Sequence, residues 1–446
     1  MRRLFVGIVL FATACAGTSA STSTVPLTTT TSTGSSGPTV TDLADEIDAF
    51  FAGIGEGLDP AVVDSIGASG DERLAWILAD LLRFLGSGAD RDRVVSAFEK
   101  LSTSELPDDA SAWVKSTNLL IERNTAAPDE YVRWKGALYT AVEERWAPFF
   151  VEPSSLDYRL LGWGGVLPDD RPFGDTELPC ARGCIPALDF PEVTDAAAGD
   201  WYPDDAVVFG VTIGDESRAY PKNIMEVHEM VIDRVGGTLF GMPYCTLCGT
   251  AAAFDLEAVP ADVEPPVLRT SGLLVRSNKV MFDLNTWSTF DMFTGLATSG
   301  PLFEAGIELE RVTVVTSTWG AWRGAHPNTT IVARDGGIGR VYSDDPLRGR
   351  DDDGPIFPVG PVDGRLPVQQ PVLGVETPGG VFVAFPVDVA LAALESGERV
   401  EFAGVVVVAD GTGLRATTSS GDALPTSQSF WFAWSQFHPA TEIWVP

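Results

Sequence analysis

The chain has 446 residues, enough for two or three domains, and 45% of them are hydrophobic, which excludes a chain that is disordered throughout. Acidic residues outnumber basic ones by 62 to 30, and the formal net charge is -32. Because phosphate backbones repel a surface of that charge, we expect no nucleic-acid partner.

The N-terminus predicts export and a lipid anchor. Two arginines after Met1 precede an apolar segment, Leu4 to Ala14, which is too short to cross a bilayer because a spanning helix needs about 20 residues. Small residues stand directly before Cys15, which resembles the lipidation site of bacterial lipoproteins, although Ala12 replaces the usual leucine. We therefore expect a signal peptide over residues 1–15 and lipidation of Cys15, with an ordinary cleaved signal peptide as the alternative.

A flexible tether is predicted next. Residues 16–39 are almost entirely Ser, Thr, Gly, Pro and Ala, and such a segment cannot bury enough apolar area to fold. The chain would then be exported and anchored to the outer face of the cytoplasmic membrane or to the cell surface, with the lipid anchor as its contact with the membrane.

Residues 40–150 are predicted to form a small helical domain. From Leu74 to Leu85 apolar residues recur at three- and four-residue steps, which gives a helix one apolar stripe. Similar stripes run from Leu43 to Ile54 and from Tyr131 to Trp146. This stretch has no histidine, no cysteine and no glycine-rich phosphate loop, so we expect it to serve packing or partner binding.

From about residue 157 the pattern changes to short β-type runs separated by Gly, Pro and Asp, as in Ala206–Ile213 and Gly404–Val408. The expected fold class is therefore α+β, with the helical N-terminal domain followed by a β-rich domain over residues 157–446.

The β-rich domain is predicted to contain an internal duplication, with units at about 205–335 and 370–446. The units begin alike, with Ala219-Tyr-Pro221 and Ala384-Phe-Pro386. They also end alike, with Trp322-x-x-x-His326-Pro-x-Thr and Trp434-x-x-x-His438-Pro-x-Thr. Because His326 and His438 occur in both units, we interpret them as structural residues.

Residues found in one unit alone are more informative. In the gapless alignment of the two units, His228 stands opposite Ala393 and Cys245 stands opposite Asp410. The first unit therefore carries Cys245-x-x-Cys248 at the tip of a predicted hairpin and His228 on a short predicted helix. We interpret these residues as additions to a plain scaffold.

The sequence has five cysteines, and apart from Cys15 they form two close pairs, Cys180/Cys184 and Cys245/Cys248. Structural disulfides are one interpretation, since exported thiols tend to oxidise. Metal binding is the second: the two pairs would form a four-sulfur set, or His228 would replace one sulfur, and such ligands suit zinc or copper(I). Redox exchange by Cys245 and Cys248 is the third, although this Cys-x-x-Cys lies between β-type runs and does not open a helix.

A series of motifs occurs in a fixed order along residues 160–446. They are Ile185-Pro-Ala-Leu-Asp189, Ala219-Tyr-Pro221, Val227-His-Glu229, Tyr244-Cys-x-Leu-Cys-Gly249, Ser271-Gly-Leu273, Ser277-Asn278-x-x-Met281-x-Asp283 and Phe430-Trp-Phe-Ala-Trp-x-x-Phe-His438-Pro-x-Thr441. In this order they resemble a bacterial and archaeal family of exported proteins known as domain of unknown function 3179.

The resemblance implies which positions belong to the family's motifs. These positions are Cys245, Cys248, His228, Ser277, Asn278 and Asp283. Cys180 and Cys184 are not part of the family pattern, which favours a local disulfide between them. Ser277, Asn278 and Asp283 fit turns and strand ends as well as they fit a polar site.

The function we predict from the sequence is binding of a soft or borderline metal ion, zinc or copper. Cys245 and Cys248 would be the thiolate ligands and His228 the nitrogen ligand, with Glu229 beside them. An exported thiol–disulfide protein that uses the same cysteines is one alternative. A non-catalytic binding protein with disulfide-stapled loops is the other, and its partner would be a small molecule or a protein. Whether the protein is an enzyme is left open.

Overall fold

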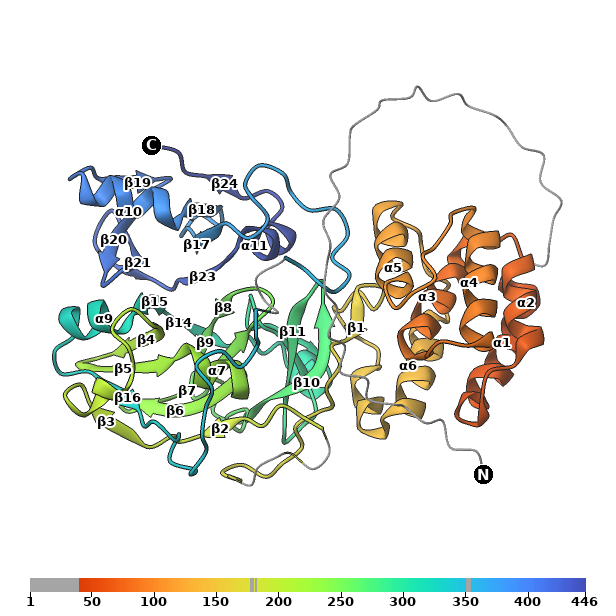
Figure 1. The fold of residues 1–446 in the computed structure, drawn as a ribbon, viewed down its shortest axis with the longest axis horizontal. Coiled ribbons are helices and arrows are strands. Elements are labelled where there is room, and N and C mark those ends of the chain that lie inside the picture. Colours follow the sequence, from red (N-terminus) through yellow and green to blue (C-terminus); the bar gives the residue numbers. More distant parts are fainter. Residues whose placement is uncertain (1–39, 177–179, 181–182, 350–353) are drawn as a thin grey trace. The chain divides into compact units, whose positions relative to one another are not determined.

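The computed structural model describes residues 40–176, 180, 183–349 and 354–446, and the chain divides into two compact units, Met1–Val142 and Glu143–Pro446 (Figure 1). The predicted signal peptide over residues 1–15, the predicted lipidation site Cys15 and the predicted tether over residues 16–39 lie outside the described residues. In the part of the chain that is described, no helix is long and apolar enough to cross a membrane.

The first unit is helical, as the apolar stripes predict. Its helices are α1 (Val40–Ala52), α2 (Pro60–Ala68), α3 (Ala75–Phe84), α4 (Ala89–Ser102), α5 (Ala112–Glu122) and α6 (Tyr131–Val142), with short 3-10 turns η1 (Ile54–Glu56) and η2 (Glu72–Leu74). Helix α2 begins where its sequence predicts: Pro60 occupies the first turn, and the Asp59 carboxylate accepts a hydrogen bond from the Ala61 amide. The apolar stripe from Leu74 to Leu82 is buried in the core of the unit.

The core of the helical unit also contains a buried ion pair. Lys135 of α6 and Asp80 of α3 have side chains that are 1% and 9% exposed, and Lys135 Nζ lies 2.8 Å from Asp80 Oδ1. The Tyr131 hydroxyl donates a hydrogen bond to the other carboxylate oxygen at 2.6 Å. These contacts join α3 to α6.

The predicted helical domain extends to residue 150, but α6 ends at Val142. Trp146, which the periodicity assigns to the same apolar stripe as Tyr131, lies in the 3-10 helix η3 (Glu144–Phe149) of the second unit. There its indole nitrogen donates a hydrogen bond to the Ser271 carbonyl at 2.9 Å. The helical spacing of apolar residues therefore continues past the end of the helical unit and into the β-rich unit.

The second unit is β-rich, and its described residues form five sheets. The sheet that carries the candidate cysteines consists of β14 (Glu310–Val312), β9 (Ala253–Asp255), β7 (Thr238–Cys245), β6 (Met230–Val235) and β2 (Leu188–Asp189), with β8 (Thr250–Ala251) paired to β7. A second sheet consists of β1 (Leu161–Trp163), β10 (Leu268–Val275), β11 (Asn278–Asp283), β12 (Thr289–Asp291) and β13 (Ala297–Ser299).

The other sheets continue the β-rich unit. The third has the order β15 (Val314–Thr318), β4 (Val207–Ile213), β5 (Glu216–Pro221), β16 (Thr330–Val332) and β3 (Val193–Asp195). The fourth has β23 (Ser427–Phe430), β17 (Pro371–Glu376), β18 (Phe382–Pro386) and β24 (Glu442–Ile443). The fifth has β19 (Val400–Phe402), β20 (Val405–Asp410), β21 (Gly413–Thr418) and β22 (Ala423–Leu424). The short helices between strands are η4 (Ala198–Trp201), α7 (Lys222–His228), α8 (Pro301–Glu304), α9 (Trp319–Ala325), α10 (Val387–Glu395) and α11 (Trp431–Phe437).

The third and fourth sheets share one topology. In both, a central hairpin (β4–β5 or β17–β18) pairs on one side with an antiparallel strand, β15 or β23. On its other side it pairs with a parallel strand, β16 or β24. In each sheet a tryptophan, Trp322 or Trp434, packs against a glycine of the central strand, Gly210 or Gly374, so closely that an added Cβ would lie within 2.5 Å of the ring.

In both ranges a short helix, α7 or α10, and an antiparallel set of strands, β6–β7–β9 or β19–β20–β21, follow the central hairpin. The likeness still does not extend over the whole ranges 205–335 and 370–446. The sheet of β10 to β13 lies in the first range, and the second range has no corresponding sheet among its strands. The fold is thus a helical unit followed by a β-rich unit, and the duplication with the predicted bounds is not established.

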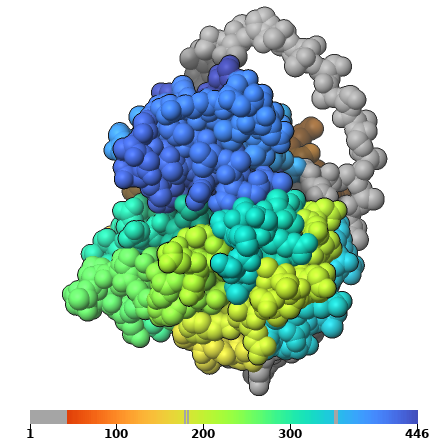
Figure 2. Space-filling model, turned by 90° about the vertical axis from the view of Figure 1, so that its left-hand side faces the viewer, coloured from red at the N-terminus to blue at the C-terminus, as the bar shows by residue number. Residues whose placement is uncertain are grey.

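Two hairpin tips reach across between the sheets of the second unit. The tip of β20–β21 meets β15 and α9: the Thr412 amide donates to Ser317 Oγ at 3.0 Å, and Asp410 Oδ1 lies 2.7 Å from His326 Nε2. The tip after β7 meets β23, where the Phe430 amide donates to the Cys248 carbonyl at 2.9 Å. Figure 2 shows the result, with the C-terminal residues (blue) as one lobe against the green and teal residues of the same unit.

Candidate functional site

Cys245 and Cys248 lie side by side in a tight turn at the end of β7. The Cys248 amide donates to the Cys245 carbonyl at 3.2 Å, which closes the turn before β8 begins. Neither cysteine forms a disulfide, and their residues are 2% and 0% exposed. Both thiols approach one acceptor, the Ser277 carbonyl oxygen, at 3.4 and 3.3 Å. The structure therefore brings the two predicted thiolate ligands together, and their binding of a metal ion stays a prediction.

The two thiols differ in acidity. Burial by itself raises the pKa of Cys245, but the hydrogen bond from the Cys248 thiol and the Lys279 ammonium outweigh burial, so the pKa of Cys245 lies below its ordinary value. Burial and the neighbouring Cys245 raise the pKa of Cys248 well above its ordinary value. Cys245 is therefore the more acidic thiol of the pair and Cys248 the less acidic one.

Lys279 supplies the positive charge of the site. It lies on β11, its side chain is 2% exposed, and its ammonium forms an ion pair with the Glu229 carboxylate. The ammonium also donates to the Glu229 carbonyl at 3.2 Å and to Thr270 Oγ1 at 3.3 Å. A lysine buried at this depth keeps its charge only where such partners surround it.

Glu229 holds the lysine from an unusual backbone position. It follows α7 with a φ of 51°, in the left-handed region that non-glycine residues seldom adopt. Its carbonyl also accepts from the Tyr244 amide at 3.0 Å, immediately before Cys245. The end of α7, the end of β7 and strand β11 therefore meet at this residue.

A cavity of about 170 Å³ lies beside Cys245. Its polar wall is formed by Glu226, Glu229, Thr270 and Lys279, and leucine and phenylalanine side chains that include Leu247, Leu273 and Phe357 form much of the remainder. A larger cavity of about 390 Å³, lined by residues such as Gln370, Asp388 and Gln428, contains no cysteine and no histidine in its lining. Of these two cavities, only the smaller one is lined by a free cysteine and a buried lysine, so we take it as the candidate site.

His228 does not point at the cysteines. It is fully buried, with Nδ1 at 2.7 Å from the Pro186 carbonyl and Nε2 at 2.7 Å from the Tyr342 hydroxyl. Burial lowers the pKa of His228 to about 4, so the ring is neutral, donates from Nδ1 and accepts at Nε2. Both nitrogens are engaged in hydrogen bonds. The residue next to Pro186, Ile185, lines the cavity, so His228 supports a cavity wall.

The other family-motif residues fall into two groups. Ser277 and Asn278 lie with the cysteines: Ser277 provides the shared acceptor, and Asn278 Oδ1 is 3.9 Å from Cys248 Sγ. Asp283 does not join them, since its carboxylate accepts from the Val267 and Thr286 amides at 2.8 Å and so holds a turn.

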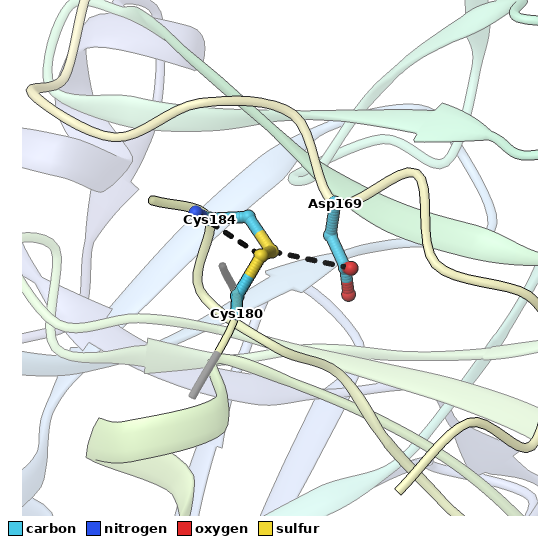
Figure 3. A group of neighbouring side chains, drawn as sticks. All are labelled: Asp169, Cys180 and Cys184. Carbon is cyan, nitrogen blue, oxygen red and sulfur yellow. Dashed lines mark hydrogen bonds between the residues drawn. A yellow bond between two sulfur atoms is a disulfide. The ribbon is translucent and has the colours of Figure 1, made fainter. Parts of the chain in front are cut away.

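Cys180 and Cys184 form the local disulfide that the resemblance implies. With Asp169 they are the one group of three ligand-type side chains in the described part of the chain whose ligand atoms lie within 4.8 Å of each other (Figure 3). Asp169, however, accepts from Arg171 Nε at 2.7 Å on one oxygen and from the Ala187 amide at 2.8 Å on the other. This group therefore fits a structural role, and its sulfurs are joined to each other.

Lys279 is the residue of the candidate site that the sequence did not predict. It directly follows the Ser277-Asn278 motif and begins an otherwise apolar run, Val280-Met281-Phe282. A lysine on a strand whose six residues are all buried is unusual, and that exception in the pattern was the available signal.

Comparison with known proteins gives one match. Residues 182–420 match the family described as "Protein of unknown function (DUF3179)", a range that includes the cysteine turn, His228, Glu229 and Lys279 and excludes Cys180 and the closing Phe430–Thr441 motif. No curated protein and no solved structure matches the chain. The matched range covers more than half of the residues and contains every motif of the resemblance except the closing one. The chain therefore belongs to the DUF3179 family.

Proposed function

We propose that the protein is an exported thiol–disulfide protein in which Cys245 is the nucleophile and Cys248 the resolving thiol. Cys245 is the more acidic of the two thiols, so it is the one that loses its proton and attacks. On oxidation by a low-molecular-weight disulfide, a bond forms between the two sulfurs and the partner's S–S bond breaks, so that the partner takes the two electrons and two protons and leaves as two thiols. The observation that carries the proposal is the contrast between two adjacent, unbonded thiols, one with a lowered and one with a raised pKa.

The surroundings of the pair support this use. The turn hydrogen bond between Cys248 and Cys245 keeps the two Cα atoms within the range that a disulfide needs. The charge of Lys279 favours the thiolate, as an activated cysteine requires. The disulfide between Cys180 and Cys184 is compatible with an oxidising, exported location. Lipidation of Cys15 would anchor the protein there.

Metal binding is the competing use of the same thiols. Zinc usually takes four ligands, and here two thiols are adjacent while both nitrogens of His228 are hydrogen-bonded elsewhere. Zinc or copper binding through Cys245, Cys248 and His228 would require the His228 ring to leave Pro186 and Tyr342. We therefore rank redox chemistry first. A role as a binding protein with stapled loops ranks last, because Cys180 and Cys184 form such a staple but Cys245 and Cys248 do not.

The likeness of the third and fourth sheets supports a further part of the proposal, that residues 205–335 and 370–446 descend from one unit. In that case Cys245 occupies the position of Asp410. Each lies at a hairpin tip, and each tip contacts a sheet of the other repeat. The thiol pair would then have arisen at an existing contact between the two repeats.

The test is a redox titration of the mature exported protein. We expect Cys245 and Cys248 to interconvert reversibly between dithiol and disulfide, with a potential between about -270 and -120 mV, the range of exchange proteins. Alkylation and mass spectrometry at each buffer potential report the fraction oxidised. The C180S/C184S variant is the matched control and should titrate like the wild type.

Two outcomes would overturn the proposal. A Cys245–Cys248 potential below about -300 mV would mark an inert structural bond. About one zinc or copper ion per chain, lost in the C245S/C248S variant and retained in C180S/C184S, would establish a metal site instead.

A further inference from the structure

The thiol pair is enclosed, and this limits what can react with it. Cys245 and Cys248 are 2% and 0% exposed, so the two sulfurs are not presented to the surface of a partner protein. Exchange with a protein disulfide requires the attacking sulfur to approach the disulfide directly, with both chains around it. Such an approach has no room here.

Cys245 is nevertheless open to small molecules, because it lines the cavity of about 170 Å³. That volume accommodates a few non-hydrogen atoms. The lining combines apolar side chains such as Leu247 and Phe357 with Cys245 and with the Lys279 ammonium, which is paired with the Glu229 carboxylate of the same lining. A suitable substrate is therefore small, reacts with a thiolate and develops negative charge beside an ammonium group.

Two residues that contact the thiols also carry polar atoms that lack a partner. Ser277 Oγ and Asn278 Nδ2 are buried and have no hydrogen-bond partner among the described residues. The residues that carry them are those that contact the sulfurs: the Ser277 carbonyl meets both, and the Asn278 amide meets Cys248. Since buried polar groups normally have partners, these two donors remain available for a further acceptor near the thiol pair.

We propose that the pair reduces small hydroperoxides, the class that includes hydrogen peroxide, and this inference rests on the proposed redox function. The Cys245 thiolate attacks one peroxide oxygen: an S–O bond forms and the O–O bond breaks. The leaving oxygen takes a proton from solvent beside the Lys279 ammonium, whose charge stabilises it, and departs as an alcohol or water. Cys245 is then a sulfenic acid.

The second step uses Cys248. Its thiol attacks the sulfenic sulfur, an S–S bond forms, the S–O bond breaks, and the hydroxide leaves as water with the proton of Cys248. The raised pKa of Cys248 keeps that proton in place until this step. Two molecules of a low-molecular-weight thiol, entering by the same cavity, then reduce the disulfide by exchange and leave as their own disulfide.

The test compares oxidants on the reduced mature protein. One equivalent of hydrogen peroxide should convert Cys245 and Cys248 to the disulfide at least about a hundredfold faster than it oxidises free cysteine at the same pH. In the C248S variant, dimedone should trap a sulfenic acid on Cys245. The C180S/C184S variant, whose changes lie outside the thiol pair, should react like the wild type.

The role of Lys279 has its own readout. In K279M the ratio of the peroxide rate to the iodoacetamide rate should fall by about a hundredfold, because alkylation depends on the thiolate alone while peroxide cleavage also needs the charge. K279R should recover part of the ratio. If K279M does not fold, the wild-type rate and the C248S trapping experiment decide.

Diamide, which links neighbouring thiols without a peroxide, distinguishes the peroxide inference from the proposed redox function. Disulfide formation with diamide, together with a peroxide rate equal to that of free cysteine, would overturn the peroxide inference and leave the redox function standing. Failure of both oxidants to link the pair would overturn both. Faster oxidation by a protein disulfide, such as scrambled ribonuclease, than by peroxide would also overturn the inference.

Discussion

The side chains of the candidate site have two kinds of role: some change the charge around the thiols, and others hold the cavity wall in place. Lys279 and Glu229 act on the thiols through charge, since the ammonium of one is fixed by the carboxylate and the carbonyl of the other. His228 acts on the structure around the cavity, through its bonds to Pro186 and Tyr342. The sequence presented His228 and Cys245 as equivalent members of one site, and the structure gives them different tasks.

The buried histidines predict a loss of stability in acid. Burial lowers the pKa of His228, and also that of His438, to about 4, whereas an unfolded histidine titrates near 6.5. Below pH 6.5 these histidines are therefore protonated in the unfolded chain but not in the folded one. The free energy of unfolding falls as the pH drops from 6.5 to about 4. The fully developed effect is about 3 kcal/mol for His228.

Urea unfolding of the wild type and of H228N at several pH values measures this contribution. The free energy of unfolding should fall less steeply between pH 6.5 and 4 in H228N, whatever its value at pH 7. A wild-type slope that persists unchanged in H228N would show that folding does not lower the pKa of His228. H438N provides the comparison, because it removes the share of the other histidine.

At the scale of elements, the third and fourth sheets depend on the same close contact. The indoles of Trp322 and Trp434 cover Gly210 and Gly374, and each indole nitrogen donates to a threonine, at 2.9 and 3.0 Å. The short helices α9 and α11 place these indoles after the antiparallel edge strand of each sheet. A glycine in a strand is otherwise unfavourable, so the contact explains why it is there.

We expect G210A and G374A to lower the free energy of unfolding by similar amounts, about 1–3 kcal/mol each, because the added methyl group would overlap the indole. Chemical denaturation of the full chain measures the loss. G324A is the matched control, since Gly324 lies in α9 with nothing within 4 Å of an added Cβ. Unequal effects of G210A and G374A would show that the two sheets are not packed alike.

At the scale of the whole molecule, the chain has two units with separate cores. The helical unit encloses the Lys135–Asp80 pair, and the β-rich unit encloses the thiol pair. Removing Lys135 would leave Asp80 buried without its cation, which typically costs about 3–5 kcal/mol.

The K135M variant should therefore destabilise the helical unit alone. In scanning calorimetry we expect one transition to move to lower temperature while a second, that of the β-rich unit, stays in place. The rate at which Cys245 is alkylated should not change. K100M is the control, because Lys100 is an exposed residue of α4 and its loss should move neither transition. A single transition that shifts as a whole would show that the two units unfold together.

The sequence by itself determined the features that depend on neighbours along the chain. Helical and alternating periods separated a helical unit from a β-rich one, and the motifs identified the family and the Cys245-x-x-Cys248 turn. The local disulfide followed from the family resemblance. The helical period misassigned Trp146, because a repeat along the chain carries no information about which core a side chain enters.

Only the tertiary structure decided which distant residues meet the thiols. Lys279 and Glu229 are 50 positions apart, and they meet because α7, β7 and β11 come together at one point. His228 turns away from the cysteines because Pro186 and Tyr342 satisfy both of its nitrogens. Such contacts arise from packing between elements. Because a buried polar group without a partner costs free energy, each of these groups must find a hydrogen-bond partner in the fold.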